Sequence, residues 1–200
     1  MIRALPLLGV SLLVAACGGS TPPPPESPEP AAKEPAAKEP EPEAEPEAAK
    51  EPAPAPIEVT MEAKSGSKLA GKATLEETAD GVKVTLSVSG ISPGPHGAHV
   101  HEKGDCSSPD GKSAGDHFNP GGHKHGMPHG SERHLGDLGN IEIAANGEGK
   151  LEITIAGANL KPGDKSSFLD RAIIVHEKKD DGGQPVGNAG GRIGCGVIKR

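Results

Sequence analysis

Residues 57–200 contain several segments in which apolar and polar side chains alternate, the pattern of β-strands that bury one face. The alternation is clearest in residues 57–63 and 82–88. Residues 171–176 and 193–199 are short apolar runs bounded by Gly or charged residues, which also favours strands. No helical stripe of useful length is present. The pattern predicts an all-β domain of roughly seven or more short strands, arranged as an antiparallel sandwich or barrel.

A turn signal joins two further strand-like segments. Asn146-Gly147 lies between residues 141–145 and 150–156. Because both residue types tolerate positive φ angles, the dipeptide predicts a tight hairpin turn. Residues 102–137 differ, since they contain Gly, Pro, Asp and His without sustained periodicity. An irregular segment of this length inside a compact domain is usually functional.

Composition divides the 200-residue chain near Pro56. Thirteen of the 21 Pro lie between Pro22 and Pro56, and residues 20–56 hold nine Glu against three Lys. Residues 57–200 hold 17 Lys and Arg against 19 Asp and Glu. This near balance argues against a basic nucleic-acid-binding domain. Because the whole chain has two Phe and no Trp or Tyr, the core of the domain must be mainly aliphatic.

The N-terminal residues 1–16 are expected to be a signal peptide. Arg3 precedes an apolar run that is too short to span a bilayer and has the length of a signal-peptide core. The run ends in Val-Ala-Ala-Cys, which resembles the lipobox of bacterial lipoproteins and marks Cys17 as the lipidated residue. The alternative is an ordinary signal peptide with an incidental cysteine. We expect a lipid-anchored protein of the cell envelope. Gly18 favours the periplasmic side of the outer membrane in a Gram-negative host.

Residues 17–56 are expected to form a disordered stalk that begins at the lipidated cysteine. The pentapeptide Ala-Ala-Lys-Glu-Pro occurs three times within them, with Glu-Pro repeats between. Ala, Lys and Glu favour helix, but the recurring Pro removes a hydrogen bond from each turn, so extended chain is favoured. The excess of Glu resists collapse. Residues 57–200 then form one folded domain.

The histidines indicate metal binding, since all nine lie in this domain. His99 and His101 flank Val100 in a strand-like segment, so both imidazoles face one side, about 7 Å apart at their Cα atoms. On its own, such a pair is more often two polar residues on an exposed face than a pair of metal ligands. Three more imidazoles and a carboxylate follow with a composition typical of a tetrahedral zinc site. They are His117, His125, His134 and Asp137.

Five motifs, in their order and spacing, resemble the copper,zinc superoxide dismutase family, in its bacterial lipoprotein form. They are Gly97-Ala98-His99-Val100-His101-Glu102, His117-Phe118-Asn119-Pro120, Glu132 to Asn140, Val175-His176-Glu177-Lys178, and Gly187 to Gly190 with Cys195 to Ile198. The resemblance covers essentially all of residues 57–200. It implies an antiparallel Greek-key β-sandwich or barrel, immunoglobulin-like, with long metal-binding loops.

The resemblance further implies one copper and one zinc per chain. The copper ligands would be His99, His101, His117 and His176. The zinc ligands would be His117, His125, His134 and Asp137. His117 would bridge the two metals as an imidazolate, which requires both cations because imidazole does not lose its second proton near neutrality. Nitrogen-only ligation suits copper, and a tetrahedral site with one carboxylate suits zinc.

Other residues gain expected roles from the same resemblance. Asp180 would accept hydrogen bonds from one ligand of each metal, His99 and His125. Without the resemblance it would be assigned to an exposed run of charged residues. Arg192 would lie over the copper and attract a small anionic substrate. Cys106 and Cys195 would form a disulfide, in keeping with an oxidising compartment.

The implied activity is dismutation of superoxide to dioxygen and hydrogen peroxide by one-electron chemistry at copper, with zinc structural. Arg192 and His117 would be the catalytic residues, and the activity would protect the cell envelope. The alternative is an envelope copper or zinc storage or delivery protein on the same fold. Expected partners are the superoxide anion, the membrane through Cys17 and a second copy in a homodimer of unassigned interface, without nucleic acid.

Some residues fall outside the family pattern. His96, His123 and His129 have no counterpart among its ligands, and we expect solvated loop histidines, the alternative being that His123 and His129 assist metal capture. The segment after Asp181 is short, so steering of the substrate by charges in that loop is in doubt. Three Lys are candidates to replace it, the alternative being that they serve solubility alone. They are Lys124, Lys178 and Lys179.

Overall fold

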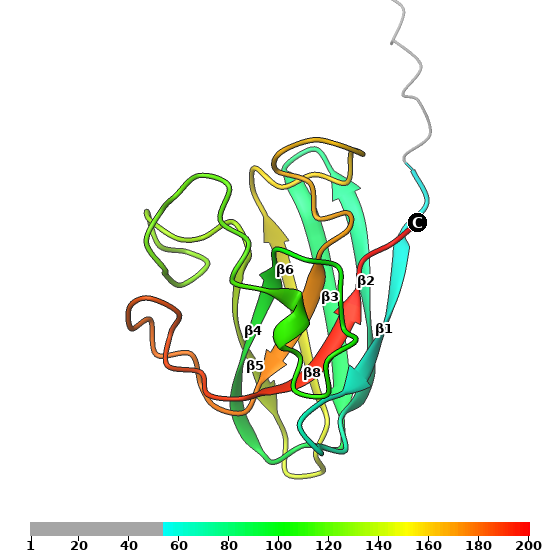
Figure 1. Ribbon diagram of the computed structural model, residues 1–200, viewed down its shortest axis with the longest axis vertical. Helices are drawn as coiled ribbons and strands as arrows, with labels where there is room; N and C mark the ends of the chain where they lie inside the picture. The colour runs from blue at the N-terminus through cyan, green and yellow to red at the C-terminus, as the bar shows by residue number, and fades with distance from the viewer. Residues whose placement is uncertain (1–53) are drawn as a thin grey trace, which may run out of the picture. The chain divides into compact units, whose positions relative to one another are not determined.

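The computed structural model describes residues 54–200. The predicted signal peptide, Cys17 and nearly all of the predicted stalk therefore lie outside the described residues. The described part is all-β, as predicted (Figure 1), with one short 3₁₀ turn at Lys112–Ala114. The strands are β1 (Ile57–Ala63), β2 (Ala70–Thr78), β3 (Gly81–Ser89), β4 (Gly94–His101), β5 (Asp137–Ile143), β6 (Gly149–Ile155), β7 (Ala172–His176) and β8 (Arg192–Val197). Within residues 54–200, no helix is long and apolar enough to cross a membrane.

The eight strands close into a barrel in the order β1-β2-β3-β6-β5-β4-β7-β8, and every neighbouring pair is antiparallel. Strands β3 and β4 are consecutive in sequence but not neighbours, and the same holds for β6 and β7. These two crossovers are Greek-key connections. The predicted fold class is therefore confirmed.

The barrel interior is aliphatic because the predicted alternation places one face of each strand inside. In β3, Val82, Val84 and Leu86 are fully buried while the residues between them are partly exposed. The only two Phe of the chain, Phe118 and Phe168, also belong to the core, with ring centroids 6.0 Å apart. Because aromatic residues are few, closely packed Val, Ile and Leu side chains fill most of the interior.

The predicted hairpin exists, but its strands separate. Gly147 has a positive φ of 79°, whereas Asn146 does not, so only one residue of the dipeptide uses the left-handed region. Beyond Ile143 and Gly149, which are the one registered pair, β5 pairs with β4 and β6 pairs with β3. The two strands remain neighbours in the barrel, but most of their ladder pairs are made with β4 and with β3.

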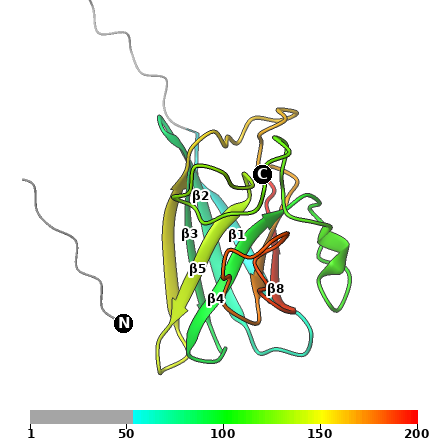
Figure 2. The same ribbon diagram turned by 90° about the vertical axis from the view of Figure 1, so that its left-hand side faces the viewer.

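Two of the long connections lie on the same side of the barrel. Residues 102–136 join β4 to β5, and residues 177–191 join β7 to β8. Figures 1 and 2 show the second connection passing across β4, and the Gly97 N–H donates to the Lys178 carbonyl oxygen at 2.8 Å. A disulfide between Cys106 and Cys195 fastens the first connection to β8. The first connection carries five of the nine histidines.

Candidate metal centre

Strand β4 presents two histidines on the side of the sheet that faces the loops. Ala98 and Val100 point into the core, and the alternation places His99 and His101 on the other side, with all four side chains fully buried. The pairing with β5 shifts register between Ala98 and His99, as at a β-bulge. The strand pattern therefore orients both imidazoles towards one point, as predicted.

Two further histidines reach the same point from different elements. His176 ends β7, whose Val175 pairs with Ala98 of β4. His117 lies in the long loop, which is bound to β4 because the Phe118 N–H donates to the Val100 carbonyl oxygen at 2.8 Å. Ligand nitrogens from all four rings lie within 4.8 Å of one another. The group is His99, His101, His117 and His176.

Three of these rings use one nitrogen for the protein and leave the other unpaired. His99 Nε2 donates to Asp180 Oδ2 at 2.8 Å, and His101 Nδ1 donates to the Gly115 carbonyl oxygen at 2.8 Å. His176 Nδ1 donates to the Gly190 carbonyl oxygen at 3.3 Å. The opposite nitrogens, His99 Nδ1, His101 Nε2 and His176 Nε2, are buried and have no hydrogen-bond partner among the described residues. Because unpaired buried nitrogens are costly, the group fits a metal that accepts their lone pairs.

The second group surrounds Asp137 at the start of β5. Its Oδ1 lies 3.1 Å from His117 Nδ1, 3.1 Å from His125 Nδ1 and 3.3 Å from His134 Nδ1. One carboxylate oxygen has two lone pairs, so it cannot accept well from three ring nitrogens. A cation between the oxygen and the nitrogens accounts for this crowding. The residues are therefore suited to a tetrahedral site with one carboxylate, the composition that zinc prefers.

The loop backbone holds the other oxygen of Asp137. Oδ2 accepts the Gly126 N–H at 3.0 Å and the His134 N–H at 2.8 Å. Burial by itself would raise the pKa of the Asp137 carboxyl, but the hydrogen bonds from His117 and Gly126 outweigh it and lower this pKa below its usual value. The carboxylate is thus ionised and oriented before any metal binds.

His99 also lies close to this second group, since its ligand atom is within 4.8 Å of those of His117, His125 and Asp137. Its Nε2 is already bonded to Asp180, and its Nδ1 belongs to the first group. His134 Nδ1 lies 3.4 Å from His117 Nδ1 and completes the second set without competition. The arrangement is compatible with the four residues that the sequence assigns to zinc.

Asp180 links the two groups from behind. Its Oδ2 accepts from His99 Nε2, and its Oδ1 faces His125 Nε2 at 3.0 Å and accepts the Gly182 N–H at 2.8 Å. The residue is 1% exposed, which excludes the alternative of an exposed charged run. Burial would raise the pKa of its carboxyl, but the hydrogen bonds from His99 and His125 lower it well below the usual range.

Two residues that the sequence analysis did not assign hold Asp180 in place. Asn140 of β5 donates from Nδ2 to the Asp180 carbonyl oxygen at 2.9 Å and accepts the Asp180 N–H at 2.8 Å. Gly187 has a φ of 77°, and a Cβ there would lie 2.1 Å from Asp180 Oδ1. Both residues stood within the quoted motifs, but only their contacts show what they do.

Arg192 begins β8 next to the first group. Its Nη1 donates to the Gly111 carbonyl oxygen at 2.9 Å, and its Nη2 donates to the Gly115 carbonyl oxygen at 2.7 Å. The Gly115 carbonyl oxygen also accepts from His101 Nδ1, so the guanidinium and one imidazole share an acceptor. Burial lowers the pKa of the Arg192 guanidinium, but the group remains a cation at neutral pH. A fixed positive charge therefore stands beside the histidines.

The remaining histidines and lysines occupy different settings. His123, His129 and the three candidate lysines, Lys124, Lys178 and Lys179, have exposed or partly exposed side chains. The expectation of a solvated His96 is wrong, because this residue of β4 is 3% exposed. Its Nδ1 donates to the His176 carbonyl oxygen at 2.8 Å, and its Nε2 lies 3.0 Å from the Ser92 carbonyl oxygen. The alternation of β4 does not reveal the hydrogen bond of His96, because the acceptor lies at the end of β7.

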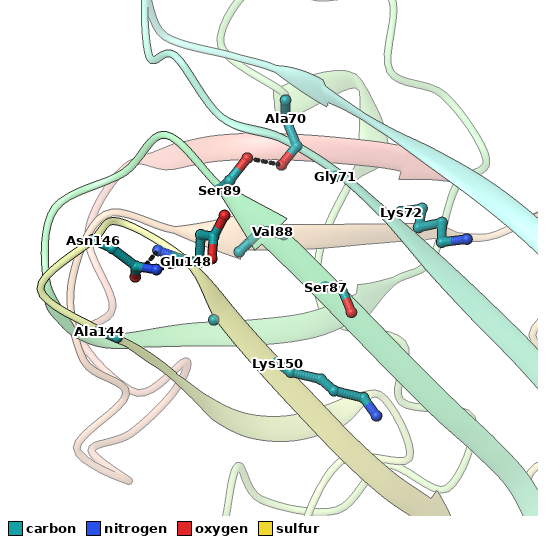
Figure 3. Close-up of a pocket in the computed structure, with 11 residues that line it drawn as sticks. Ala70, Gly71, Lys72, Ser87, Val88, Ser89, Ala144, Asn146, Glu148 and Lys150 are labelled. Carbon is teal, nitrogen blue, oxygen red and sulfur yellow. Dashed lines mark hydrogen bonds between the residues drawn. The ribbon is translucent and has the colours of Figure 1, made fainter.

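A surface cavity of about 740 Å³ lies elsewhere, on the outside of β2, β3 and β6 (Figure 3). Its lining includes small residues such as Ala70 and Gly71 together with Lys72 and Lys150. None of the predicted site residues lines it. The metal centre is instead formed between the barrel wall and the two loops.

Acid is expected to destabilise the metal-free protein. Burial lowers the pKa of the His99 imidazole from 6.5 to about 4 and that of His176 from 6.5 to about 3. As the pH falls from about 6.5 to about 4, the unfolded chain takes up protons that the folded chain excludes, so the free energy of unfolding decreases. The slope is at most about 1.4 kcal/mol per pH unit for each group. Urea unfolding of the metal-free protein at several pH values tests this. A pH-independent free energy across that window would contradict burial of neutral imidazoles.

Comparison with known proteins assigns the chain to a family. Residues 69–198 match the sequence model described as Copper/zinc superoxide dismutase (SODC). The extracellular superoxide dismutase [Cu-Zn] of Caenorhabditis elegans is 39% identical over 142 residues, which span 68% of this chain and 63% of that protein. The protein of the same description from Haemonchus contortus is 42% identical over 139 residues, 66% of this chain and 74% of that protein.

Solved structures show the same fold. A SOD-like protein from Bacillus subtilis is 36% identical, with a TM-score of 0.65 over 71% of this chain and 97% of that chain. The clock protein EA4 is 36% identical, with a TM-score of 0.66 over 74% of this chain and 95% of that chain. The family match extends over most of the barrel and includes all the histidines of both groups. The chain belongs to the copper/zinc superoxide dismutase family, whose metals are copper and zinc.

Proposed function

We propose that this domain dismutates superoxide to dioxygen and hydrogen peroxide. A copper would be held by His99, His101, His117 and His176, and a zinc by His117, His125, His134 and Asp137. The observation that carries the proposal is the set of buried imidazole nitrogens that face one point without a partner among the described residues, next to the guanidinium of Arg192. The copper would supply two oxidation states, so that one superoxide can give up an electron to it and a second superoxide can accept that electron.

The protein residues would bind and orient the superoxide anion and supply a proton to the product. Arg192 attracts the superoxide anion and orients it, since its guanidinium is fixed by two carbonyl oxygens and has no carboxylate within 4 Å among the described residues. His117 would contribute a ligand atom to both sites; in support, its Nδ1 lies 3.1 Å from Asp137 Oδ1 and its ring centroid lies 4.9 Å from that of His101. Its imidazole would also hold a proton for the product.

Storage or delivery of metal is the rival function. The fold alone does not decide, because relatives with this fold are named a SOD-like protein and a clock protein. A storage site has no evident need for a half-buried guanidinium beside its ligands. The complete set of predicted ligands together with Arg192 favours catalysis.

The two functions predict different results for purified protein. Dismutation predicts about one copper and one zinc per chain and cyanide-sensitive removal of superoxide. His176→Ala should remove that activity, because it deletes one of the converging nitrogens, whereas exposed His123→Ala should retain it. Metal content by mass spectrometry and superoxide consumption by stopped flow provide the measurement. Full metal content without turnover would support storage.

We also propose that the enzyme acts in the cell envelope, anchored through Cys17 and the stalk of residues 17–56. The support is the apolar N-terminal run, the disulfide between Cys106 and Cys195, and two relatives named extracellular. In this proposal Cys17→Ser moves the protein from the membrane fraction to the soluble fraction without changing its activity. Equal membrane association of the variant would contradict the lipid anchor. A homodimer stays a prediction.

A further inference from the structure

Lys64 is an unusually buried lysine directly after β1. Its side chain is 10% exposed, whereas lysines are rarely buried unless they are paired. Its Nζ donates to the Cys106 carbonyl oxygen at 2.5 Å and lies 3.3 Å from Glu62 Oε2. Glu62 is 63% exposed, so this ion pair contributes little. The buried contact is the one with the disulfide-bonded cysteine.

The turn after β1 contacts both β8 and the part of the first connection that begins at Cys106. The Lys64 N–H donates to the Ile193 carbonyl oxygen at 2.9 Å, and the Ser65 N–H donates to the Pro109 carbonyl oxygen at 2.8 Å. The Ser65 hydroxyl donates to the Arg192 carbonyl oxygen at 2.8 Å. Residues 64–65 therefore hold residues 106–109 and the start of β8 together.

The loop that Lys64 holds provides both acceptors of the Arg192 guanidinium. They are the carbonyl oxygens of Gly111 and Gly115. A Cβ at Gly111 would lie 3.2 Å from Arg192 Cβ and 3.7 Å from Lys64 Cγ, so the two long side chains lie under the same loop residue. The disulfide ties this loop to β8 at Cys106, and the Ser65 N–H ties it to the turn at Pro109. The bond from Lys64 to the Cys106 carbonyl oxygen adds a third link, which fixes the backbone orientation at the disulfide-bonded residue.

We propose that Lys64 is a positioning residue for Arg192. Its ammonium group fixes residues 106–115 against β1 and β8, so that the Gly111 and Gly115 carbonyl oxygens hold the guanidinium at the mouth of the metal centre. The inference rests on the proposed function, in which Arg192 attracts an anionic substrate. It assigns Lys64 an effect on anion affinity that a merely stabilising lysine would not have.

The test compares anion affinity in the copper- and zinc-loaded full chain. Azide is titrated against the Cu(II) absorption of the wild type, Lys64→Met and Lys68→Met. Lys68 is exposed on the same turn, and no hydrogen bond or ion pair of its side chain is found among residues 54–200, so its variant removes an equal charge. Lys64→Met should weaken azide binding by about fivefold, as expected for partial loss of a charge-assisted hydrogen bond. Lys68→Met should leave it unchanged. Metal content and the absence of free thiols are checked in each protein.

A second measurement does not need the metals. The rate at which phenylglyoxal modifies Arg192 in the metal-free protein should rise in Lys64→Met and stay constant in Lys68→Met. If Lys64→Met does not fold, Lys64→Gln carries the test, because its shorter neutral side chain loses the charge-assisted bond to the Cys106 carbonyl oxygen. It should also weaken azide binding. Wild-type azide affinity and modification rate in the folded variant would overturn the inference.

Arg192→Met separates this inference from the proposed function. In that background Lys64→Met should cause no further loss of azide affinity, since the two residues act in series. An equal additional loss would show that Lys64 acts independently of Arg192 and would refute positioning. If Arg192→Met itself changes neither azide affinity nor superoxide removal, the proposed role of Arg192 is wrong. If Arg192→Met reduces both and Lys64→Met reduces neither, only the inference fails.

Discussion

His117→Ala is expected to reduce superoxide removal by more than about 100-fold and to lower the affinity for both metals. The reason is geometric, because His117 contributes a ligand atom to each of the two groups and its Nδ1 lies 3.1 Å from Asp137 Oδ1. Stopped-flow kinetics and metal analysis measure the two effects. The matched control is His123→Ala, which removes an exposed imidazole from the same loop.

Variants of two other predicted ligands show whether His117 binds both metals or only one. His101→Ala should lower copper content alone, because His101 belongs to the first group only. His134→Ala should lower zinc content alone, because its Nδ1 faces Asp137 and His117. If His117→Ala affects only one metal, the bridging role is wrong even if the activity is lost.

Asp180→Asn is expected to weaken zinc binding by about 10- to 100-fold, the range typical of groups that orient metal ligands. Asparagine has nearly the same size, but it has one acceptor oxygen where Asp180 has two, and these face His99 and His125. One imidazole then loses its orientation. In the presence of a chelator, Asp180→Asn should also lose more copper than the wild type, because His99 belongs to the copper group. Competition titration with a chromogenic chelator measures the zinc affinity.

Asp181→Asn is the matched control. Asp181 is exposed, and its carboxylate bonds to Asn188 and to the Gly183 N–H rather than to a metal-binding group. This variant should keep wild-type zinc affinity. Equal affinity in Asp180→Asn and Asp181→Asn would show that the buried carboxylate does not orient the ligands.

The strands were predictable where alternation is strong. Residues 57–63 coincide with β1, and residues 82–88 lie within β3. β2 was missed because its buried positions are few and include Ala73 and Leu75 among polar residues. Its Gly71 is required by close packing, since a Cβ there would lie 2.2 Å from the Ser87 carbonyl oxygen. Such a contact between strands leaves no periodic signal in the sequence.

The roles of Asp180 and His96 depend on distant segments. Asp180 stands among charged residues, and it is buried because Asn140 and Gly187 approach it from two other parts of the chain. His96 was assigned to solvent, but the end of β7 covers it and accepts its hydrogen bond. Local sequence does not show which distant segments cover Asp180 and His96. Their roles therefore cannot be assigned from residue type and spacing alone.

The sequence by itself determined the strand character of the domain and the residues able to bind metals, because alternation and side-chain chemistry are local properties. Only the tertiary structure decided which nitrogen of each imidazole is committed to the protein and which is left for a metal. His99 and Asp180 are 81 positions apart, and so are Gly111 and Arg192. Contacts over such separations arise from closure of the barrel and the crossing of its two loops.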